Sequence, residues 1–234
     1  MASPKIILYT NHNCPWAHRA HIALKELGLV YEEVIIDLTK PREPWYLDVN
    51  PRGLVPSLSY NGTIITESAI VAQFLADAHP SHLVPPSGSV DGALQRAQIA
   101  FFVDTFLSKV QPHVHASLRA STAAEIDAAA DALVAAVETE LEPLLAAWKG
   151  PGPFFGGSDR LTLAEVLTGS FLLRILHYSD ARIGLLSARL PALLERTPRF
   201  KRWAEATVQQ ESVNFIWDAL KSANAIKAKL GITR

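Results

Sequence analysis

The chain has 234 residues, of which 49% are hydrophobic and 19% charged, a composition typical of one or two globular domains rather than of a disordered chain. Lys and Arg number 22 against 23 Asp and Glu, and the resulting net charge of -1 gives no electrostatic reason to expect nucleic acid or an anionic membrane as a partner. Cys14 is the single cysteine, which excludes an intramolecular disulfide and a zinc site of several thiolates. We therefore expect no metal.

The N-terminal residues lack a basic segment followed by an apolar one, so the sequence predicts no signal peptide. Charged residues interrupt the long apolar stretches before they reach the length of a membrane helix. A protein without disulfides and without these signals is expected in a reducing compartment, the cytoplasm.

The first 80 residues alternate strand and helix signals. The apolar run 6–9 predicts a strand covered on both faces. A polar loop then leads to a helix over 15–27, with Pro15 in its first turn and Gly28 as its stop. Residues 31–37 predict a second strand, and the order strand, helix, strand implies a parallel pair.

A polar stretch with two prolines, 39–44, separates these elements from a second group. The apolar runs 55–60 and 63–65 flank Asn61-Gly62, which is a strong signal for a β-hairpin. Apolar residues at helical spacing then predict a helix over 67–78.

The part of the chain that follows carries helix signals only. The first helix is expected over 93–118. A second begins at Thr122, where Glu125 three residues later completes a capping box, and Pro143 should kink its last turns. Thr162 and Glu165 form the same box for a third helix. A fourth is expected from 191, and a last one over 208–230.

Prolines, glycines and serines gather in 80–91 and predict a linker between these two parts. The chain is therefore expected to divide into a small α/β domain over 1–79, a linker over 80–91 and an all-helical domain over 92–234.

The segment Asn-Cys-Pro-Trp at 13–16 is the strongest candidate for chemistry. It follows the first strand, where open α/β sheets bind ligands, and it places Cys14 at a helix N-terminus, where free backbone N–H groups favour a thiolate. The helix dipole supplies about 0.3–1 kcal/mol, whereas a useful thiolate at neutral pH requires roughly 2.7 kcal/mol. Direct hydrogen bonds or a nearby cation must supply the rest, and His18 and Arg19 are the nearest candidates.

Two further segments are candidates for a binding site: Val55-Pro56 before a predicted strand, and Glu67-Ser68 at the start of a predicted helix. These two segments and Cys14 also have ordinary structural explanations. A lone cysteine is often a small buried hydrophobe, Val55-Pro56 can simply open a strand, and Glu67-Ser68 can be an ordinary helix cap. Because the chain holds no second thiol, a dithiol–disulfide cycle is excluded. A cycle with one protein thiol remains possible, because a small thiol from solution can reduce the mixed disulfide that forms on the cysteine.

Taken together and in this order, the three features resemble the cytosolic glutathione transferases. Cys-Pro-Trp-Ala at 14–17 is similar to the omega class and to related fungal cysteine-type enzymes. Asn-Pro-Arg-Gly-Leu-Val-Pro at 50–56 and Thr-Glu-Ser-Ala-Ile at 66–70 match the glutathione-site segments of that family. Phe-Phe-Gly-Gly at 154–157 and Leu-Thr-Leu-Ala-Glu at 161–165 match the turn and cap of its helical domain, where the family usually carries Asp in place of Glu165. The resemblance implies a thioredoxin-like domain of order β-α-β-α-β-β-α, followed by an all-α domain.

The family's roles, carried over residue by residue, imply a glutathione site with no metal. Cys14 would form a mixed disulfide with glutathione, beside Pro15 and Trp16. Val55 would pair its backbone with the cysteinyl part of glutathione, made possible by a cis bond to Pro56.

The two ends of glutathione would be held by charged and polar groups. Glu67 would accept from the γ-glutamyl ammonium, and Ser68 with its helix N-terminus would hold the carboxylate. The family binds the glycyl end with a lysine shortly before Glu-Trp, and this sequence departs there, reading Lys-Pro-Arg-Glu-Pro-Trp at 40–45. Arg42 is the preferred counterpart and Lys40 the alternative.

The family builds its acceptor pocket from the loop before the cysteine, the first long helix of the second domain and the C-terminal segment. Those positions nominate His12, Phe106, His113, Tyr178 and Trp217. The alternative for each of them is packing in the core.

Three functions follow from the resemblance. The leading one is a glutathione-dependent thiol transferase or reductase that acts through a Cys14–glutathione mixed disulfide. The second is conjugation, ether cleavage or isomerisation with glutathione, in detoxification or biosynthesis. The third is a non-catalytic, transferase-like binding module. In each case the expected partners are glutathione and a small electrophile or disulfide, and a second copy in a homodimer, with neither nucleic acid nor membrane.

Overall fold

The computed structural model describes residues 3–233, and its N-terminal part has the predicted β-α-β-α-β-β-α order. The elements are β1 (Ile6–Thr10), α1 (Pro15–Glu26), β2 (Glu32–Ile35), α2 (Pro44–Val49), β3 (Ser57–Tyr60), β4 (Thr63–Thr66) and α3 (Ser68–Ala78). The predicted thioredoxin-like domain is thereby confirmed. The second strand is shorter than the predicted 31–37.

The four strands form one mixed sheet in the order β2-β1-β3-β4. β1 runs parallel to β2 and antiparallel to β3, and β3 pairs with β4 as a hairpin. Asn61 and Gly62 join the hairpin with φ values of 51° and 89°, the left-handed conformations that a tight two-residue turn requires. The carboxyl end of β1, next to its parallel neighbour, is where the loop to α1 begins.

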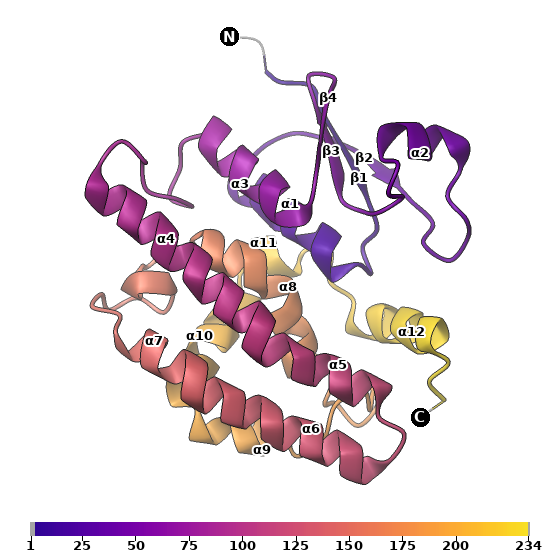
Figure 1. Cartoon of the computed structure of the whole chain (residues 1–234), viewed down its shortest axis with the longest axis vertical. Helices are drawn as coiled ribbons and strands as arrows, with labels where there is room; N and C mark the ends of the chain where they lie inside the picture. The colour runs from indigo at the N-terminus through magenta and orange to yellow at the C-terminus, as the bar shows by residue number, and fades with distance from the viewer. Residues whose placement is uncertain (1–2, 234) are drawn as a thin grey trace.

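α1 and α3 lie between the sheet and the second part of the chain, whereas α2 lies apart from them (Figure 1). α1 packs against α3 and against helix α8 (Leu163–His177). Its apolar residues join one large core that runs through both parts of the molecule. α2 covers a smaller core through Tyr46, which is buried with Ala17, Ile36 and Val55. The site-bearing loop is therefore fixed from both sides.

The second part is all helical. Its other helices are α4 (Val90–Thr105), α5 (Gln111–Arg119), α6 (Ala123–Ala136), α7 (Glu142–Ala146), α9 (Leu190–Leu193), α10 (Pro198–Val208), α11 (Glu211–Asn214) and α12 (Ala219–Leu230). α8 is buried along almost its whole length and lies at the centre of the bundle (Figure 1). Within residues 3–233, none of the helices is long and apolar enough to cross a membrane.

Two π-helical segments interrupt the long helices. Phe106–Val110 separates α4 from α5, and Val137–Leu141 separates α6 from α7. Each lies just before a proline, Pro112 or Pro143, which has no N–H to donate and therefore disrupts the regular hydrogen-bond ladder. The expected irregularity at Pro143 is present. The helix expected over 93–118 is present as the continuous helical run of α4, Phe106–Val110 and α5. The irregularity near Pro112 within it was not expected.

The single helix expected over 208–230 is wrong. α10 ends at Val208, and a turn closed by the hydrogen bond from the Trp217 N–H to the Asn214 carbonyl separates α11 from α12. The side chain of Asp218 then caps α12 by accepting from the Lys221 N–H, so a new helix begins where the sequence pattern suggested continuity. This break places Trp217 in a loop beside α8.

Two buried histidines of α1 make the stability of the fold depend on pH. Burial lowers the pKa of His18 well below its usual 6.5 and that of His21 to about 3. In the unfolded chain both side chains take up a proton as the pH falls through 6.5, whereas in the folded protein they stay neutral. Their contribution to stability is therefore complete above about pH 7 and is lost on acidification, by about 2 kcal/mol at pH 5 for His21, with His18 acting in the same direction.

We expect the free energy of unfolding by urea to fall by about 2 kcal/mol between pH 8 and pH 5 through His21, and to fall further through His18. The variant His18→Asn should reduce that pH dependence, whatever its stability at pH 8. An unchanged pH dependence in this variant would contradict the assignment.

Candidate active site around Cys14

Cys14 is the N-cap residue of α1 and is half-buried. Pro15 occupies the first turn of the helix, as predicted. The Sγ of Cys14 lies 4.0 Å from the carbonyl oxygen of Val55, and the Val55-Pro56 peptide bond is cis. The structure therefore brings together the cysteine and the backbone segment that the resemblance assigned to the cysteinyl part of glutathione.

Short polar side chains hold the loop around Cys14 in place. The Asn11 side chain donates to the Ile36 carbonyl at 3.0 Å and accepts from the Asn13 N–H at 3.0 Å. The Cys14 N–H in turn donates to the Asn11 carbonyl at 3.0 Å. The loop between β1 and α1 thus has a fixed conformation that leaves the thiol at the end of the helix.

The segment that carries Val55 is equally constrained. The Tyr46 hydroxyl donates to the Leu54 carbonyl at 2.6 Å, and the Asn50 side chain donates to the same carbonyl at 2.9 Å. Val55 and Pro56 are themselves buried. A preformed backbone edge of this kind loses little conformational entropy of its own when a ligand pairs with it.

Glu67 and Ser68 lie together at the start of α3. Glu67 has a φ of 68°, a conformation that residues other than glycine rarely adopt and that is often found at functional sites. Its carboxylate pairs with Arg52, and the Ser68 hydroxyl accepts from Arg19 Nη1 at 3.2 Å. A carboxylate, a hydroxyl and a helix N-terminus are thus adjacent, which suits the charged end of an amino acid.

Arg42 and Lys40 are placed differently from each other. The Arg42 guanidinium donates hydrogen bonds to backbone carbonyls, that of Gly53 at 2.9 Å and that of Asp37 at 2.8 Å. Lys40 is largely exposed and lies 3.5 Å from the Asp37 carboxylate. Arg42 therefore ties together the loops on either side of α2, and the role of either cation toward glutathione stays a prediction.

Two buried arginines flank the cysteine loop, and among residues 3–233 neither has a carboxylate partner. Arg19 donates to the Leu167 carbonyl at 2.7 Å and stacks over the ring of Trp16, whose centroid is 4.6 Å away. Arg174 of α8 donates to the Asn13 carbonyl at 3.0 Å. Both cations thus contact residues next to Cys14 in the sequence, Trp16 and Asn13.

The charges of these arginines are coupled to Cys14. Burial lowers the pKa of Arg19 to about 9 and also lowers that of Arg174, while interaction with Cys14 raises both. Arg19 therefore stays protonated at neutral pH, and the interaction with Cys14 partly offsets the effect of burial on both arginines. Arg19 was a candidate from its sequence position next to the motif. Arg174 is 160 residues further along the chain, and no local pattern could have placed it there.

The five residues nominated for an acceptor pocket separate into four groups. Tyr178 and Trp217 lie together, with ring centroids 6.2 Å apart, and the guanidinium of Arg174 stacks over Trp217 at 4.8 Å. Phe106 is fully buried against aromatic residues of the helical core. His12 forms an ion pair with Glu33, and His113 is half-buried on α5.

Arg174 connects the first of these groups to the cysteine loop, because it contacts both Trp217 and the Asn13 carbonyl. The indole Nε1 of Trp217 is buried and has no hydrogen-bond partner within residues 3–233. Phe106, by contrast, packs as an ordinary core residue. Trp217 is therefore the nominated aromatic residue that Arg174 links to the cysteine loop, whereas Tyr178 is fully buried with its hydroxyl 2.8 Å from Ser222 Oγ. The acceptor role of all five residues stays a prediction.

In this structure a cysteine caps the first helix of a thioredoxin-like domain, and an all-helical domain follows. This arrangement is that of the glutathione transferases, and comparisons with known proteins agree. The family model for the glutathione S-transferase N-terminal domain matches residues 13–78. A probable glutathione S-transferase of Oryza sativa subsp. japonica, GSTU1, is 32% identical over 206 residues, which cover 85% of this chain and 83% of that protein. Glutathione S-transferase omega-1 of Mus musculus is 29% identical over 210 residues, covering 89% and 78%.

Solved structures agree with this result. Glutathione transferase Omega 2C of Trametes versicolor superposes with a TM-score of 0.78 at 28% identity, covering 97% of this chain and 99% of that one. A rice glutathione transferase, solved in complex with glutathione, superposes with a TM-score of 0.80 at 26% identity over 100% of both chains. The chain belongs to the glutathione S-transferase family, and within it is omega-like.

Proposed function

We propose that this glutathione transferase is a thiol transferase that reduces mixed disulfides through a Cys14–glutathione intermediate. The observation that carries the proposal is the position of Cys14: a half-buried thiol at the N-terminus of α1, 4.0 Å from the Val55 carbonyl. A cysteine there bonds to the sulfur of glutathione, whereas conjugation requires that sulfur to remain a free thiolate.

The reaction has two exchange steps. In the first, the Cys14 thiolate attacks the glutathionyl sulfur of a substrate disulfide, so that a Cys14–glutathione disulfide forms and the substrate leaves as a thiolate. In the second, a glutathione thiolate attacks the glutathionyl sulfur bound to Cys14. Oxidised glutathione leaves and the Cys14 thiolate is restored. Overall, the mixed disulfide and one glutathione thiolate from solution become the substrate thiolate and oxidised glutathione, whose second half is the glutathionyl group that the substrate carried.

Different residues around the thiol bind different parts of glutathione. Glu67 accepts from the ammonium of the γ-glutamyl group, and Ser68 with the N-terminus of α3 holds its carboxylate. The backbone of Val55 pairs with the cysteinyl part, and Arg42 or Lys40 contacts the glycyl end. The related rice structure, which holds glutathione, supports glutathione as the co-substrate. Trp217, which is partly exposed, contacts the acceptor.

Intact mass after incubation of the native protein with oxidised glutathione near neutral pH tests this proposal. We expect one glutathionyl group per chain, added much faster than to protein unfolded in urea, because the fold provides both cations and the binding site. The single cysteine makes the added mass unambiguous. No adduct, or an adduct that forms faster in the unfolded control, would favour conjugation or a non-catalytic role.

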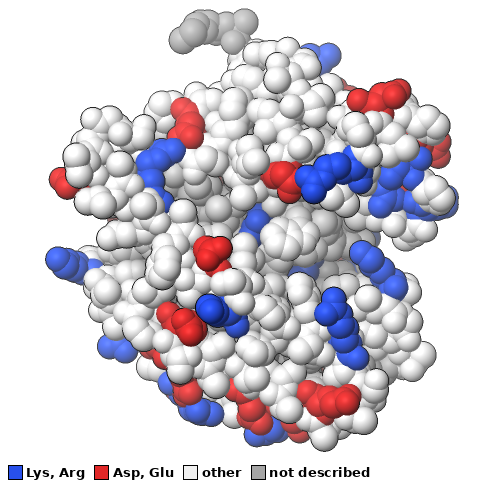
Figure 2. Space-filling model, in the orientation of Figure 1, with Lys and Arg blue, Asp and Glu red and all other residues white. Residues whose placement is uncertain are grey.

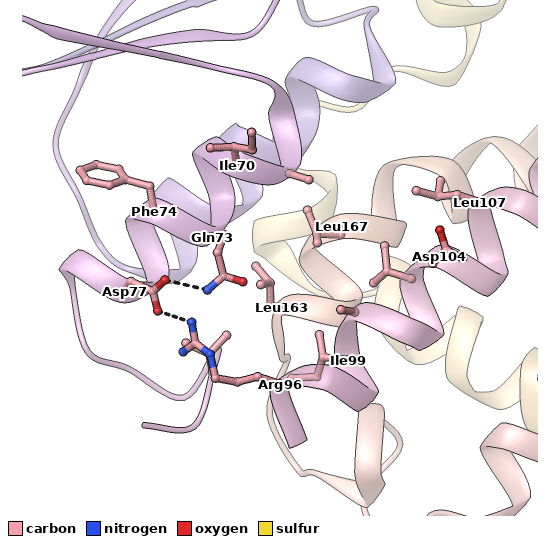
Figure 3. Close-up of a pocket in the computed structure, with 14 residues that line it drawn as sticks. Ile70, Gln73, Phe74, Asp77, Arg96, Ile99, Asp104, Leu107, Leu163 and Leu167 are labelled. Atoms are coloured by element: carbon pink, nitrogen blue, oxygen red, sulfur yellow. Dashed lines mark hydrogen bonds and ion pairs between the residues drawn. The ribbon is translucent and has the colours of Figure 1, made fainter. Parts of the chain in front are cut away.

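We also propose that the protein is a homodimer and that the groove between α3 and α4 is the surface that a second copy covers (Figure 3). The groove has a volume of about 550 Å³ and receives residues from both domains, among them Ile70 and Phe74 of α3 and Ile99 of α4. Ile70 is 57% exposed, an unusual state for isoleucine. A mass of one chain in sedimentation at micromolar concentration would contradict this assignment.

Charged groups are also present in this groove. Arg96 pairs with Asp77 across its floor, and Asp104 lies further along α4 (Figure 3). On the face drawn in Figure 2, acidic and basic side chains of the described residues are mostly interspersed. This distribution is compatible with association of like copies and offers no extended basic surface on that face.

A further inference from the structure

A second cluster of chemically active side chains lies beside the Cys14 loop and takes no part in the proposed reaction. One potential ligand atom from each of His12, His21 and Glu33 lies within 4.8 Å of the others. The residues come from the loop after β1, the middle of α1 and the start of β2. β1 pairs in parallel with β2, and Ile7 lies opposite Glu32. This pairing brings the loop after β1 close to the start of β2.

The cluster is closed on one side and open on the other. His21 is completely buried, whereas the side chains of His12 and Glu33 retain 35% and 30% of their exposure to solvent. An ion can therefore enter from solvent and keep water in the positions that the protein leaves free. His12 Nε2 already contacts Glu33 Oε1, so the carboxylate and one imidazole are side by side before an ion arrives.

The buried histidine is oriented by two hydroxyl groups. Its Nε2 lies 2.8 Å from Thr10 Oγ1, and its Nδ1 lies 2.9 Å from the Tyr31 hydroxyl. A metal that binds one ring nitrogen displaces one hydroxyl and leaves the other hydrogen-bonded to the opposite nitrogen. Metal-binding histidines are typically held in this way, with the second nitrogen donating to an oxygen that fixes the ring.

We propose that His12, His21 and Glu33 form a binding site for a divalent transition metal, with Zn²⁺ as the first candidate. Two imidazoles and one carboxylate are a ligand set that Zn²⁺ uses in proteins with a water in the remaining position. The expectation of no metal rested on the lack of cysteines for a thiolate site. It did not address this cluster, whose members become neighbours through the strand–helix–strand crossover. The inference is independent of the proposed thiol transfer.

Calorimetric titration with ZnCl₂ of the full chain, first treated with EDTA and dialysed, tests the proposal. The titration is made in the Cys14→Ser variant, because this substitution removes the nearby thiol as a competing ligand. We expect one Zn²⁺ per chain and a higher midpoint of thermal unfolding when zinc is present. In the same background, His12→Asn and Glu33→Gln should lose stoichiometric binding. Both side chains are partly exposed, so these variants are expected to fold.

A second histidine–glutamate pair provides the matched control. His82 Nε2 lies 2.9 Å from Glu26 Oε2, and within residues 3–233 no third potential ligand completes a cluster there. The variant His82→Asn should therefore bind zinc as the Cys14→Ser protein does. The proposal is overturned by absence of stoichiometric binding in Cys14→Ser, by equal binding in His12→Asn, or by equal loss in His82→Asn.

Discussion

Replacement of Cys14 by alanine is expected to reduce glutathione-dependent disulfide reduction by about 10³-fold or more, because the chain has no other thiol to form the intermediate. The fold should be little affected, since Cys14 is half-buried at the edge of the small core and its side-chain hydrogen bond, 4.0 Å to the Val55 carbonyl, is weak. Steady-state rates with a glutathionylated peptide or a small mixed disulfide measure the first effect. The midpoint of thermal unfolding measures the second.

The variant Cys14→Ser separates reduction from conjugation. It keeps a group that can donate a hydrogen bond to the sulfur of bound glutathione but cannot form a disulfide with it. We expect reduction to be lost as fully as in Cys14→Ala, and conjugation of glutathione to an activated aryl halide to appear or increase in the serine variant alone. Wild-type rates of disulfide reduction in either variant would show that Cys14 is not the nucleophile.

Local patterns in the sequence were sufficient for the elements that carry Cys14. An apolar run followed by a polar loop and a proline predicted a strand and a helix start, and β1 and α1 lie there. Asn61-Gly62 predicted a hairpin for the same reason: its backbone preference is a property of the two residues themselves. Each of these signals is contained within a few neighbouring residues.

The features that local patterns missed depend on contacts between distant segments. Arg174 donates to the Asn13 carbonyl, and Ser170 of the same helix donates to the Pro15 carbonyl at 2.8 Å. An arginine in a helical sequence ordinarily predicts an exposed face, so its burial beside the cysteine follows from the packing of α8 on α1. The cluster of His12, His21 and Glu33 has the same origin. The break before α12, in contrast, had a local signal in Asp218, which is a good N-cap residue.

The largest expected effect on stability is at Glu165, which lies in the core of the helical part. Its carboxylate is fully buried and accepts hydrogen bonds from the Thr162 N–H, the Phe155 N–H and Trp203 Nε1, at 2.7–2.8 Å, and from the Thr162 hydroxyl. Burial raises the pKa of Glu165, and the hydrogen bonds from Trp203 and Thr162 counteract that rise. The side chain thereby joins the start of α8 to the turn at 154–157 and to α10.

We expect Glu165→Ala to lower the free energy of unfolding by about 4 kcal/mol or more. Three buried N–H donors lose their acceptor, each at a cost of about 1–3 kcal/mol, and a cavity replaces the side chain. Glu165→Gln should have roughly half of this effect. The amide keeps one acceptor oxygen, but an NH₂ group replaces the other oxygen and cannot accept a hydrogen bond from the donors that face it. Urea unfolding monitored by circular dichroism measures both variants.

The chain contains its own control for this prediction. Glu125 forms the same capping box with Thr122 at the start of α6, but there the motif lies on the surface. Its partners are the N–H groups of Ser121 and Thr122, which water can satisfy when the carboxylate is removed. Glu125→Ala should therefore destabilise the protein much less than Glu165→Ala. Equal losses would mean that the box itself, and not the buried network around Glu165, sets the stability of this region.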